Sequence, residues 1–353
     1  MLGTDSKKIG GFLGLELPLV RPSGRSAWQI MTDGALQVHH GRTARSVLNA
    51  ILHASSPKKI WYPAYCCPEV ALGHETAERH FFPVGPELRP DVDWLASRLQ
   101  SQDIVLAVNY FGQPPVDDFL ALTRARPDVL WIEDCAQGLA VGTAWGDWRL
   151  FSPRKLFGVP DGGIGVCLNA AKTLNISEDP GPGDRFSDLE ALAPLLWRFE
   201  DSEETLNDIW HAAYLKSETR SFSDASRRGQ AGISGLSHQL LQAIDAEEMI
   251  HRRCANACAL YDLVPQDILF WDAPPTAAPL GFPILLNDRD KLAGGMSAQG
   301  IFCPVHWRHL PSEAHAFPEE HHLTSSMLTL PCDQRYDLRD MEVIAEAVSA
   351  LLN

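Results

Sequence analysis

Residues 130 to 165 read LWIEDCAQGLAVGTAWGDWRLFSPRKLFGVPDGGIG, and they join an apolar run, an acid at its end and a lysine in a glycine-rich loop. The run VLWIE at 129–133 is typical of a buried strand. Asp134 follows it at the strand end, where open α/β sheets gather their ligands. Lys155 lies among prolines and glycines that favour a tight irregular loop over an exposed helix face. The stretch therefore predicts an α/β protein with a site at the strand ends.

The pairing of Lys155 with Asp134 indicates a particular chemistry. An aldehyde cofactor needs an amine to hold it as a Schiff base, and a carboxylate keeps its ring nitrogen protonated so that the ring accepts electrons. Taken alone, Asp134 is equally a helix cap or turn residue, and most lysines are surface charges. Together the two residues point to pyridoxal 5'-phosphate as the cofactor.

Length and composition indicate a globular protein of two domains. The chain has 353 residues, 45 % of them hydrophobic and 21 % charged, and no apolar run approaches the roughly 20 residues that span a bilayer. The first residues lack the apolar region and the cleavage site typical of a secretory signal, so we expect no such signal and a cytoplasmic protein. The eight cysteines include no CxxC pair, so we expect reduced thiols. The net charge of −15 argues against a nucleic acid partner. We expect neither a nucleic acid nor a membrane as a partner.

Strand-like and helix-like segments alternate along the chain, which favours a mostly parallel sheet covered by helices on both faces. We expect a large domain over residues 1–232, of which 170–232 is a mostly helical connector or insertion, and a linking helix with a small α/β domain over 233–353. The expected strands are 60–65, 104–110, 129–133, 163–168, 280–286 and 301–305. The expected helices are 43–54, 91–100, 116–126, 233–262, 289–299 and 338–352, with two more around 189–199 and 206–214.

A third element of the site is HHGRTARSVL, in which Gly41 precedes a helix whose first turn carries Arg42 and Thr43. Backbone N–H groups, the helix dipole, a hydroxyl and a guanidinium together suit a phosphate group. The same pattern is also an ordinary helix start, so its interpretation depends on Lys155 and Asp134.

Several ordered blocks resemble the DegT/DnrJ-type aminotransferases, a family of pyridoxal-phosphate enzymes of fold type I best known for acting on sugars. The segment at 39–52 resembles the family's Gly-Thr phosphate-binding helix start, and IWYPAYCCPEVA its Pro-Ser-Tyr-Thr-Phe segment. NYFGQPPVDDFLAL, IEDCAQGLA and FSPRKLFGVPDGGIGVCL are similar to the family's Gly-Gln-Pro, Glu-Asp-Ala-Ala-Gln and lysine-loop blocks. The segments starting at Phe282 and Leu328 resemble the family's small domain, so the resemblance covers most of the chain.

The resemblance implies a role for each matching residue. Lys155 would form the Schiff base and carry the proton between the substrate carbon and the cofactor, and Asp134 would pair with the pyridine nitrogen. Gln137 would lie near the phenolic oxygen or ring face, and Tyr65 would line the ring pocket. The candidates for the phosphate are Gly41, Arg42, Thr43 and Ser152. His306 and Arg308 are substrate candidates, Arg308 for the donor carboxylate.

Three departures from the family bear on the substrate. Cys67 stands where the family places an aromatic residue, and the family's serine five residues before the lysine is Leu150, with Ser152 three before. The Asn-Tyr-Arg-Met segment, which completes the neighbouring subunit's site in the family, has no clear counterpart; Arg227 or Arg228 could substitute.

The leading hypothesis is a homodimeric aminotransferase that moves an amino group from an amino acid, by resemblance glutamate, to a carbonyl substrate such as a keto-sugar. Two alternatives stay open: a pyridoxal-phosphate enzyme with another acceptor or reaction, and a non-catalytic protein that keeps the fold. The histidines crowded at 306–322 suggest a metal, but their spacing matches no zinc signature, and we expect no metal site.

Overall fold

The computed structural model describes residues 8–11, 13–18, 22–71, 77–139, 144–176 and 232–352, together with residues 212 and 215. The helices expected around 189–199 and 206–214 lie, apart from residue 212, outside this range, as do Arg227 and Arg228.

A seven-stranded sheet forms the centre of the N-terminal half, in the order β2-β9-β8-β6-β5-β3-β4. Neighbours from β4 through β3, β5, β6 and β8 run parallel, whereas β9 is antiparallel to both β8 and β2. The strands are β2 (Gln37–Gly41), β3 (Lys59–Pro63), β4 (Glu78–Phe82), β5 (Ile104–Val108), β6 (Leu130–Asp134), β8 (Trp148–Phe151) and β9 (Gly163–Cys167). Every residue of β5, β6, β8 and β9 is buried, as expected of strands covered on both faces.

Helices pack on this sheet through two apolar cores. One joins the inner face of α2 to β3, β5 and β6, and includes Val47, Leu48 and Phe119. The other joins α1 and α8 to β9, and includes Met31, Leu241 and Ile164. The helices of this half are α1 (Ala27–Met31), α2 (Ala44–Ser55), α3 (Pro68–Ala71), α4 (Val92–Ala96) and α5 (Asp117–Ala125), with short 3-10 turns η1 (Tyr110–Gly112), η2 (Pro153–Lys155) and η3 (Ala170–Lys172).

The single helix expected at 233–262 is wrong: the structure has two helices, α8 (Gly235–Ala243) and α9 (Ala246–Leu263). Asp245 makes the break. One carboxylate oxygen of Asp245 accepts hydrogen bonds from the N–H groups of Glu247 and Glu248 and so caps α9, and the other accepts from Ser23 and Gly24. Asp245 has an extended backbone, whereas the residues on either side of it keep a helical spacing of apolar positions. That spacing alone therefore does not reveal the interruption.

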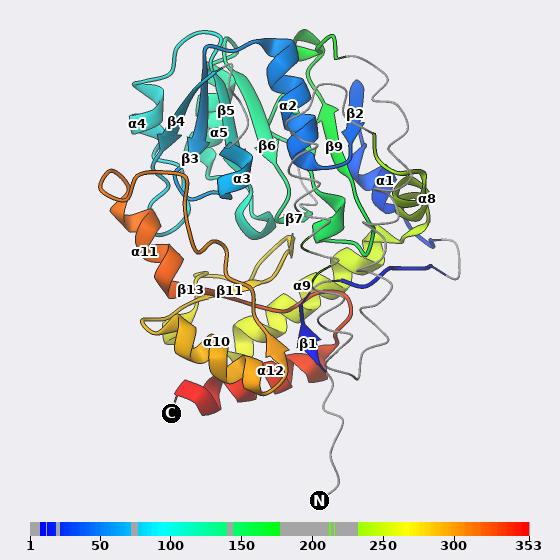
Figure 1. The fold of residues 1–353 in the computed structure, drawn as a ribbon, viewed down its shortest axis with the longest axis vertical. Helices are drawn as coiled ribbons and strands as arrows, with labels where there is room; N and C mark the ends of the chain where they lie inside the picture. Colours follow the sequence, from blue (N-terminus) through cyan, green and yellow to red (C-terminus); the bar gives the residue numbers. More distant parts are fainter. Residues whose placement is uncertain are drawn as a thin grey trace, which may run out of the picture.

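The C-terminal half packs around α9, which crosses in Figure 1 from the sheet to the lower elements. A third apolar core joins α9 and α12 to a β11–β13 antiparallel pair, and includes Leu260, Ile284, Leu330 and Ile344. The elements here are η4 (Gln266–Ile268), β10 (Ala278–Pro279), β11 (Phe282–Leu285), α10 (Arg289–Ala298), β12 (Ile301–Phe302), α11 (Pro318–Ser326), β13 (Met327–Leu330) and α12 (Leu338–Leu352).

Two short pairings cross between the halves of the chain. The N-terminal strand β1 (Ile9–Gly10) pairs with β12, so the first described residues lie with the C-terminal elements. Strand β7 (Gly138–Leu139), which follows β6, pairs antiparallel with β10. β7 lies in Figure 1 between the large sheet and the C-terminal elements, where the loops that follow the parallel strands are found.

The sequence predicted the α/β class and the mostly parallel central sheet. It did not predict strands β1, β2, β4, β7, β8, β10 and β13 or helices α1, α3 and α11. The strand expected at 301–305 is shorter than predicted, because only Ile301 and Phe302 pair. The expected domain division at residue 232 stays a prediction. No helix among the described residues has both the length and the apolar character to cross a membrane.

Candidate functional site at the carboxyl edge of the sheet

The candidate residues come from segments that follow the carboxyl ends of four parallel strands. Tyr65 follows β3, Asn109 follows β5, Asp134 ends β6 and Ser152 follows β8. Since β3, β5, β6 and β8 are parallel neighbours, these ends meet at one edge of the sheet. The topology therefore assembles residues that are far apart in the sequence.

Asp134 is held in a defined position and is 5 % exposed. Its Oδ1 accepts a hydrogen bond of 2.9 Å from the N–H of Ala136, and its carbonyl accepts one of 3.0 Å from Asn109. Burial raises the pKa of the Asp134 carboxyl, and the charge of Lys155 and the Ala136 hydrogen bond oppose that rise. The charge of the Asp134 carboxylate is therefore only partly balanced, and a cationic group bound beside it would stabilise the charged form.

Lys155 ends η2, the turn that follows strand β8, and lies half-buried. Its backbone N–H donates to the carbonyl of Ser152 over 3.0 Å, which closes the turn. The charge of Lys155 lowers the pKa of three groups: Asp134 from β6, Cys67 from the segment after β3, and His306 from the C-terminal half. The three groups that feel this charge, an acid, a thiol and an imidazole, come from three parts of the chain.

Gln137 is 2 % exposed, and only half of its side-chain amide is used. Its Oε1 accepts from the N–H of Phe111 over 3.0 Å, whereas its buried Nε2 has no hydrogen-bond partner among the described residues. Phe111 presents that N–H from a left-handed conformation (φ 51°), which costs a non-glycine residue about 1–2 kcal/mol. A buried amide N–H without a partner is unfavourable unless a ligand accepts from it.

Tyr65 is fully buried, and burial raises the pKa of its hydroxyl. Its carbonyl accepts from the hydroxyl of Tyr110, and its ring lies 5.4 Å from that of Trp307, centroid to centroid. Tyr65 therefore joins the loop after β3 to the segment that carries His306.

The predicted phosphate residues lie at the start of α2, beside the lysine loop. Thr43 caps α2, since its hydroxyl accepts from the N–H of Ser46 over 3.1 Å. Arg42 is 5 % exposed, and its Nη1 lies 3.4 Å from Oδ2 of Asp161. Gly41 pairs with Gly163 of β9, and a Cβ on Gly163 would lie 2.1 Å from the carbonyl carbon of Thr43. The helix start and the loop are therefore in direct contact.

The remaining predicted residues differ in their surroundings. Ser152 is buried (6 %) at the start of η2, and its side chain makes no capping hydrogen bond there. His306 is half-buried, with Nδ1 3.0 Å from the hydroxyl of Thr329, and burial together with the Lys155 charge lowers its pKa to about 4. Arg308 is exposed and forms an ion pair of 3.2 Å with Asp290.

Sequence analysis missed a buried network behind Asp134. Glu133 is 2 % exposed and faces away from Asp134 because side chains alternate along a strand. Its carboxylate accepts from Asn109 Nδ2 over 2.9 Å and from the N–H of Trp145 over 3.1 Å, and lies 3.4 Å from Nε of Arg149. The one sequence signal was an acid inside an apolar run, which is rare unless the acid is paired.

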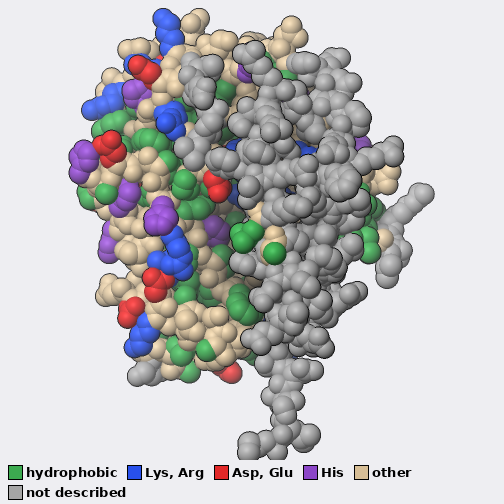
Figure 2. All heavy atoms as spheres, in the orientation of Figure 1, with side chains coloured by type: hydrophobic (Ala, Val, Ile, Leu, Met, Phe, Trp, Pro, Cys, Tyr) green, Lys and Arg blue, Asp and Glu red, His purple; other side chains and the backbone are tan. Residues whose placement is uncertain are grey.

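No three His, Cys, Asp or Glu side chains among the described residues come together as metal ligands would. In the described part of the face drawn in Figure 2, acidic, basic and histidine side chains are interspersed.

Comparisons with known proteins bear on the fold. No family model and no curated protein matches the sequence. Solved structures do match. One of them is DesV from S. venezuelae in complex with a ketimine intermediate, which matches at TM-score 0.64 and 15 % identity and covers 92 % of this chain and 87 % of that one. The chain has the fold of the DegT/DnrJ/EryC1/StrS aminotransferases.

Two further structures agree. The sugar aminotransferase CalS13 from Micromonospora echinospora matches at TM-score 0.62 and 17 % identity, covering 94 % of this chain and 93 % of that one. The PMP form of Spr1654 from Streptococcus pneumoniae matches at TM-score 0.66 and 12 % identity, with 97 % and 98 % covered. The α/β fold that the alternation of strands and helices predicts, and the fold type that the family resemblance implies, are therefore confirmed over nearly the whole chain.

Proposed function

We propose that this protein is a pyridoxal-phosphate-dependent aminotransferase in which Lys155 binds the cofactor aldehyde. The observation that carries the proposal is the placement of Lys155 and Asp134 at the ends of neighbouring strands. Asp134 ends β6 and pairs with Leu150 of β8, and the turn η2 that follows β8 carries Lys155, whose charge acts on the buried acid. A neighbouring amine and acid at this edge are what the cofactor's aldehyde and ring nitrogen require.

The residues present fit the cofactor. Asp134 is buried and lacks a full complement of counter-charge, which suits a protonated ring nitrogen. The unpartnered Nε2 of Gln137 offers a donor to an oxygen of a bound group. The start of α2 supplies a helix dipole and an adjacent guanidinium for a phosphate, and the candidates remain Gly41, Arg42, Thr43 and Ser152.

The cofactor, when bound, supplies the electron sink for breaking the bond between the substrate's α-carbon and its hydrogen. Lys155 Nζ would serve as the base that takes this proton and as the acid that returns it. Asp134 would be the acid that pairs with the ring nitrogen of the bound cofactor. His306 stays neutral above about pH 4 because of its lowered pKa, so it acts as a hydrogen-bonding group toward substrate and not as a charge.

We infer an amino acid donor, glutamate, and a carbonyl acceptor such as a keto-sugar. Solved structures of this fold include sugar aminotransferases and, for DesI, one in the presence of a TDP-sugar product. The exchange balances without an outside oxidant: one water molecule supplies the keto oxygen of the donor's product, the donor's amino group replaces the acceptor's carbonyl oxygen, and that oxygen leaves as water. The site would be completed in a homodimer.

The proposal is tested by the visible spectrum of the protein with added pyridoxal phosphate, before and after L-glutamate. We expect a band that glutamate bleaches, with one equivalent of 2-oxoglutarate formed per site. A stable band that no amino acid changes would favour the alternative of a binding protein, and bleaching by another donor would correct the donor alone.

A further inference from the structure

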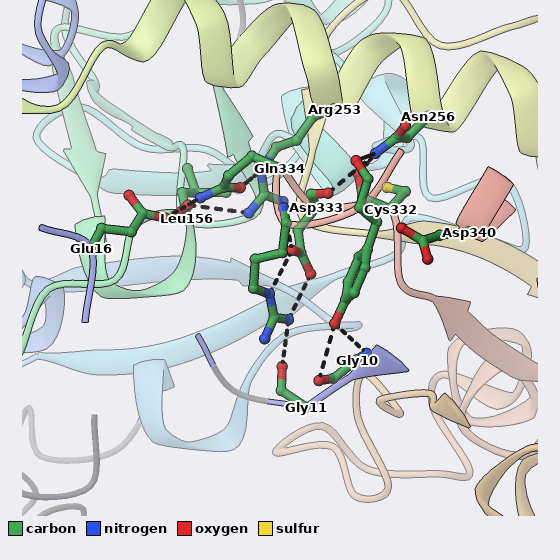
Figure 3. A network of polar contacts seen from close by, with 12 residues as sticks. Gly10, Gly11, Glu16, Leu156, Arg253, Asn256, Cys332, Asp333, Gln334 and Asp340 are labelled. Carbon is green, nitrogen blue, oxygen red and sulfur yellow. Dashed lines mark hydrogen bonds and ion pairs between the residues drawn. The ribbon is translucent and has the colours of Figure 1, made fainter. Parts of the chain in front are cut away.

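One buried arginine on the helix between the two halves holds the backbone on both sides of the candidate site. Arg253, on α9, is 1 % exposed. Its guanidinium donates to the carbonyl of Leu156 (Nη2, 3.1 Å), to those of Pro279 and Leu280 (Nη1, 2.9 and 3.2 Å), and to Oε1 of Gln334 (Nε, 2.8 Å). Figure 3 shows Arg253 reaching from α9 towards Gln334 and Leu156.

The first of these contacts reaches the lysine. Leu156 directly follows Lys155, and its carbonyl accepts a second hydrogen bond, of 2.8 Å, from Nε2 of Gln334. Gln334 Nε2 also donates to Oε1 of Glu16 over 2.6 Å, and the N–H of Glu16 donates to the carbonyl of Gly158 over 2.8 Å. Two side chains from the C-terminal half therefore fix the backbone one residue beyond Lys155.

The second pair of contacts reaches Gln137. Pro279 and Leu280, whose carbonyls Arg253 binds, lie in and just after β10, which pairs with β7. The N–H of Leu280 donates to the carbonyl of Gln137 over 2.8 Å. One guanidinium thus binds both the carbonyl of the residue after Lys155 and the carbonyl of Leu280, whose N–H binds Gln137, the residue whose side-chain Nε2 lacks a partner among the described residues.

Packing alone does not account for an arginine here. Among the described residues, no carboxylate lies within ion-pair distance of Arg253, and Asp333 is instead bound by Arg335 through two contacts of 2.7 and 2.8 Å. The charges of Asp333 and Glu16 act on Arg253 from beyond ion-pair distance, but the groups that it binds directly are neutral, and such burial is unfavourable unless the hydrogen bonds are well formed. A planar guanidinium is the side chain that meets several acceptors in one fixed arrangement, which a lysine cannot do.

We propose that Arg253, with Gln334, is a positioning residue that sets the place of Lys155 relative to Gln137, so that the lysine meets a cofactor aldehyde already aligned. The inference rests on the proposed function, because it concerns how that site captures its cofactor. Misplacement of a reacting group by about 1 Å can cost about 10²-fold in rate.

The test compares Arg253→Lys and Gln334→Met with the parent. The control is Arg252→Lys, at the preceding position of α9, where the side chain is exposed and pairs with Glu248 over 3.1 Å. Each protein is mixed with pyridoxal phosphate, and three quantities are measured: the rate of lysine capture by absorbance, the pH titration of the resulting band, and the thermal midpoint without cofactor.

We expect Arg253→Lys to capture the cofactor about 10- to 100-fold more slowly and to shift the pH titration of the band, since both depend on where the lysine amine lies. Gln334→Met should shift both in the same direction by less, because Arg253 still binds the Leu156 carbonyl, and Arg252→Lys should match the parent. Gln334→Met decides the question if Arg253→Lys does not accumulate as folded protein.

Two results would overturn the inference in distinguishable ways. If the parent captures cofactor but the variants only lower the thermal midpoint, with parental capture rate and titration, the residues are structural and the proposed function stands. If the parent itself captures no cofactor, the proposed function fails and the positioning role fails with it.

Discussion

The guanidinium of Arg42 lies 3.4 Å from the carboxylate of Asp161, and neither side chain is more than 6 % exposed. This pair joins the start of α2 to the loop that carries Lys155. The N–H of Gly162 strengthens the junction by donating to the carbonyl of Arg42 over 2.7 Å. Asp161 also accepts from the hydroxyls of Ser234 and Ser237, at the start of α8. The predicted phosphate helix and lysine loop therefore form one unit.

Asp161→Asn should destabilise the protein by about 3–5 kcal/mol, because it removes the carboxylate charge that faces buried Arg42. Urea unfolding followed by circular dichroism measures the change. Asp128→Asn is the control, since Asp128 pairs with Arg126 at the surface and such pairs contribute about 0–1 kcal/mol. Equal losses of unfolding free energy in the two variants would show that the buried ion pair contributes no more to stability than the surface pair.

Asp134→Asn should stabilise the cofactor-free protein at neutral pH while weakening cofactor binding. Burial raises the pKa of the Asp134 carboxyl in the folded state, so the folded protein is penalised as pH rises through that pKa, and the penalty is absent in acid. Asparagine removes the charge and keeps an oxygen for the 2.9 Å hydrogen bond from Ala136. Thermal midpoints at pH 4 and pH 8 test this: the gain should appear at pH 8 alone. A loss of stability at pH 8 would contradict it.

Gly163→Ala should destabilise the start of α2 by about 1–3 kcal/mol or more, because the new Cβ would lie 2.1 Å from the carbonyl carbon of Thr43 and backbone would have to move. Gly294→Ala is the matched control, since it has open space around its Cβ position within helix α10 and alanine favours helix there. Chemical unfolding of both variants gives the comparison. If Gly163→Ala is as stable as Gly294→Ala, the close contact at Thr43 is not present.

His306→Asn should remove an acid sensitivity of the fold. The folded protein holds His306 neutral down to about pH 4, whereas an unfolded chain protonates it near its ordinary value of 6.5. The parent therefore loses stability as pH falls from about 6.5 towards 4, and the variant should lose less. His315→Asn, whose side chain is 81 % exposed, should follow the parent. Parallel pH profiles for all three proteins would mean that His306 titrates normally.

The central sheet was predictable because its signals are local. Each of the predicted strands at 60–65, 104–110 and 129–133 is an apolar run bounded by turn residues, and each forms within a few residues of its expected place. Strands β2, β4 and β8 were not predicted, since HHG, ERHFF and WRLF carry charged or histidine side chains and their strand character comes from pairing with neighbours.

The site was predictable in part, for a similar reason. The sequence around Lys155 predicts a loop and the sequence around Asp134 predicts a strand end, so the α/β fold was enough to predict that both residues lie at the same edge of the sheet. The roles of Glu133 and Arg253 depend on acceptors distant in the sequence, such as Asn109 and Leu156, and nothing in the residues around Arg253 distinguishes it from exposed Arg252. Only the folded structure separates these neighbouring arginines.

The most direct measurement of the central claim is mass spectrometry of the protein after incubation with pyridoxal phosphate and reduction with borohydride. We predict one label per chain, on the peptide that contains Lys155, and none in Lys155→Ala. Lys291→Ala, which changes an exposed lysine on α10, should label as the parent does. A label that persists in Lys155→Ala, or a parent in which Lys155 stays unlabelled, would contradict the account.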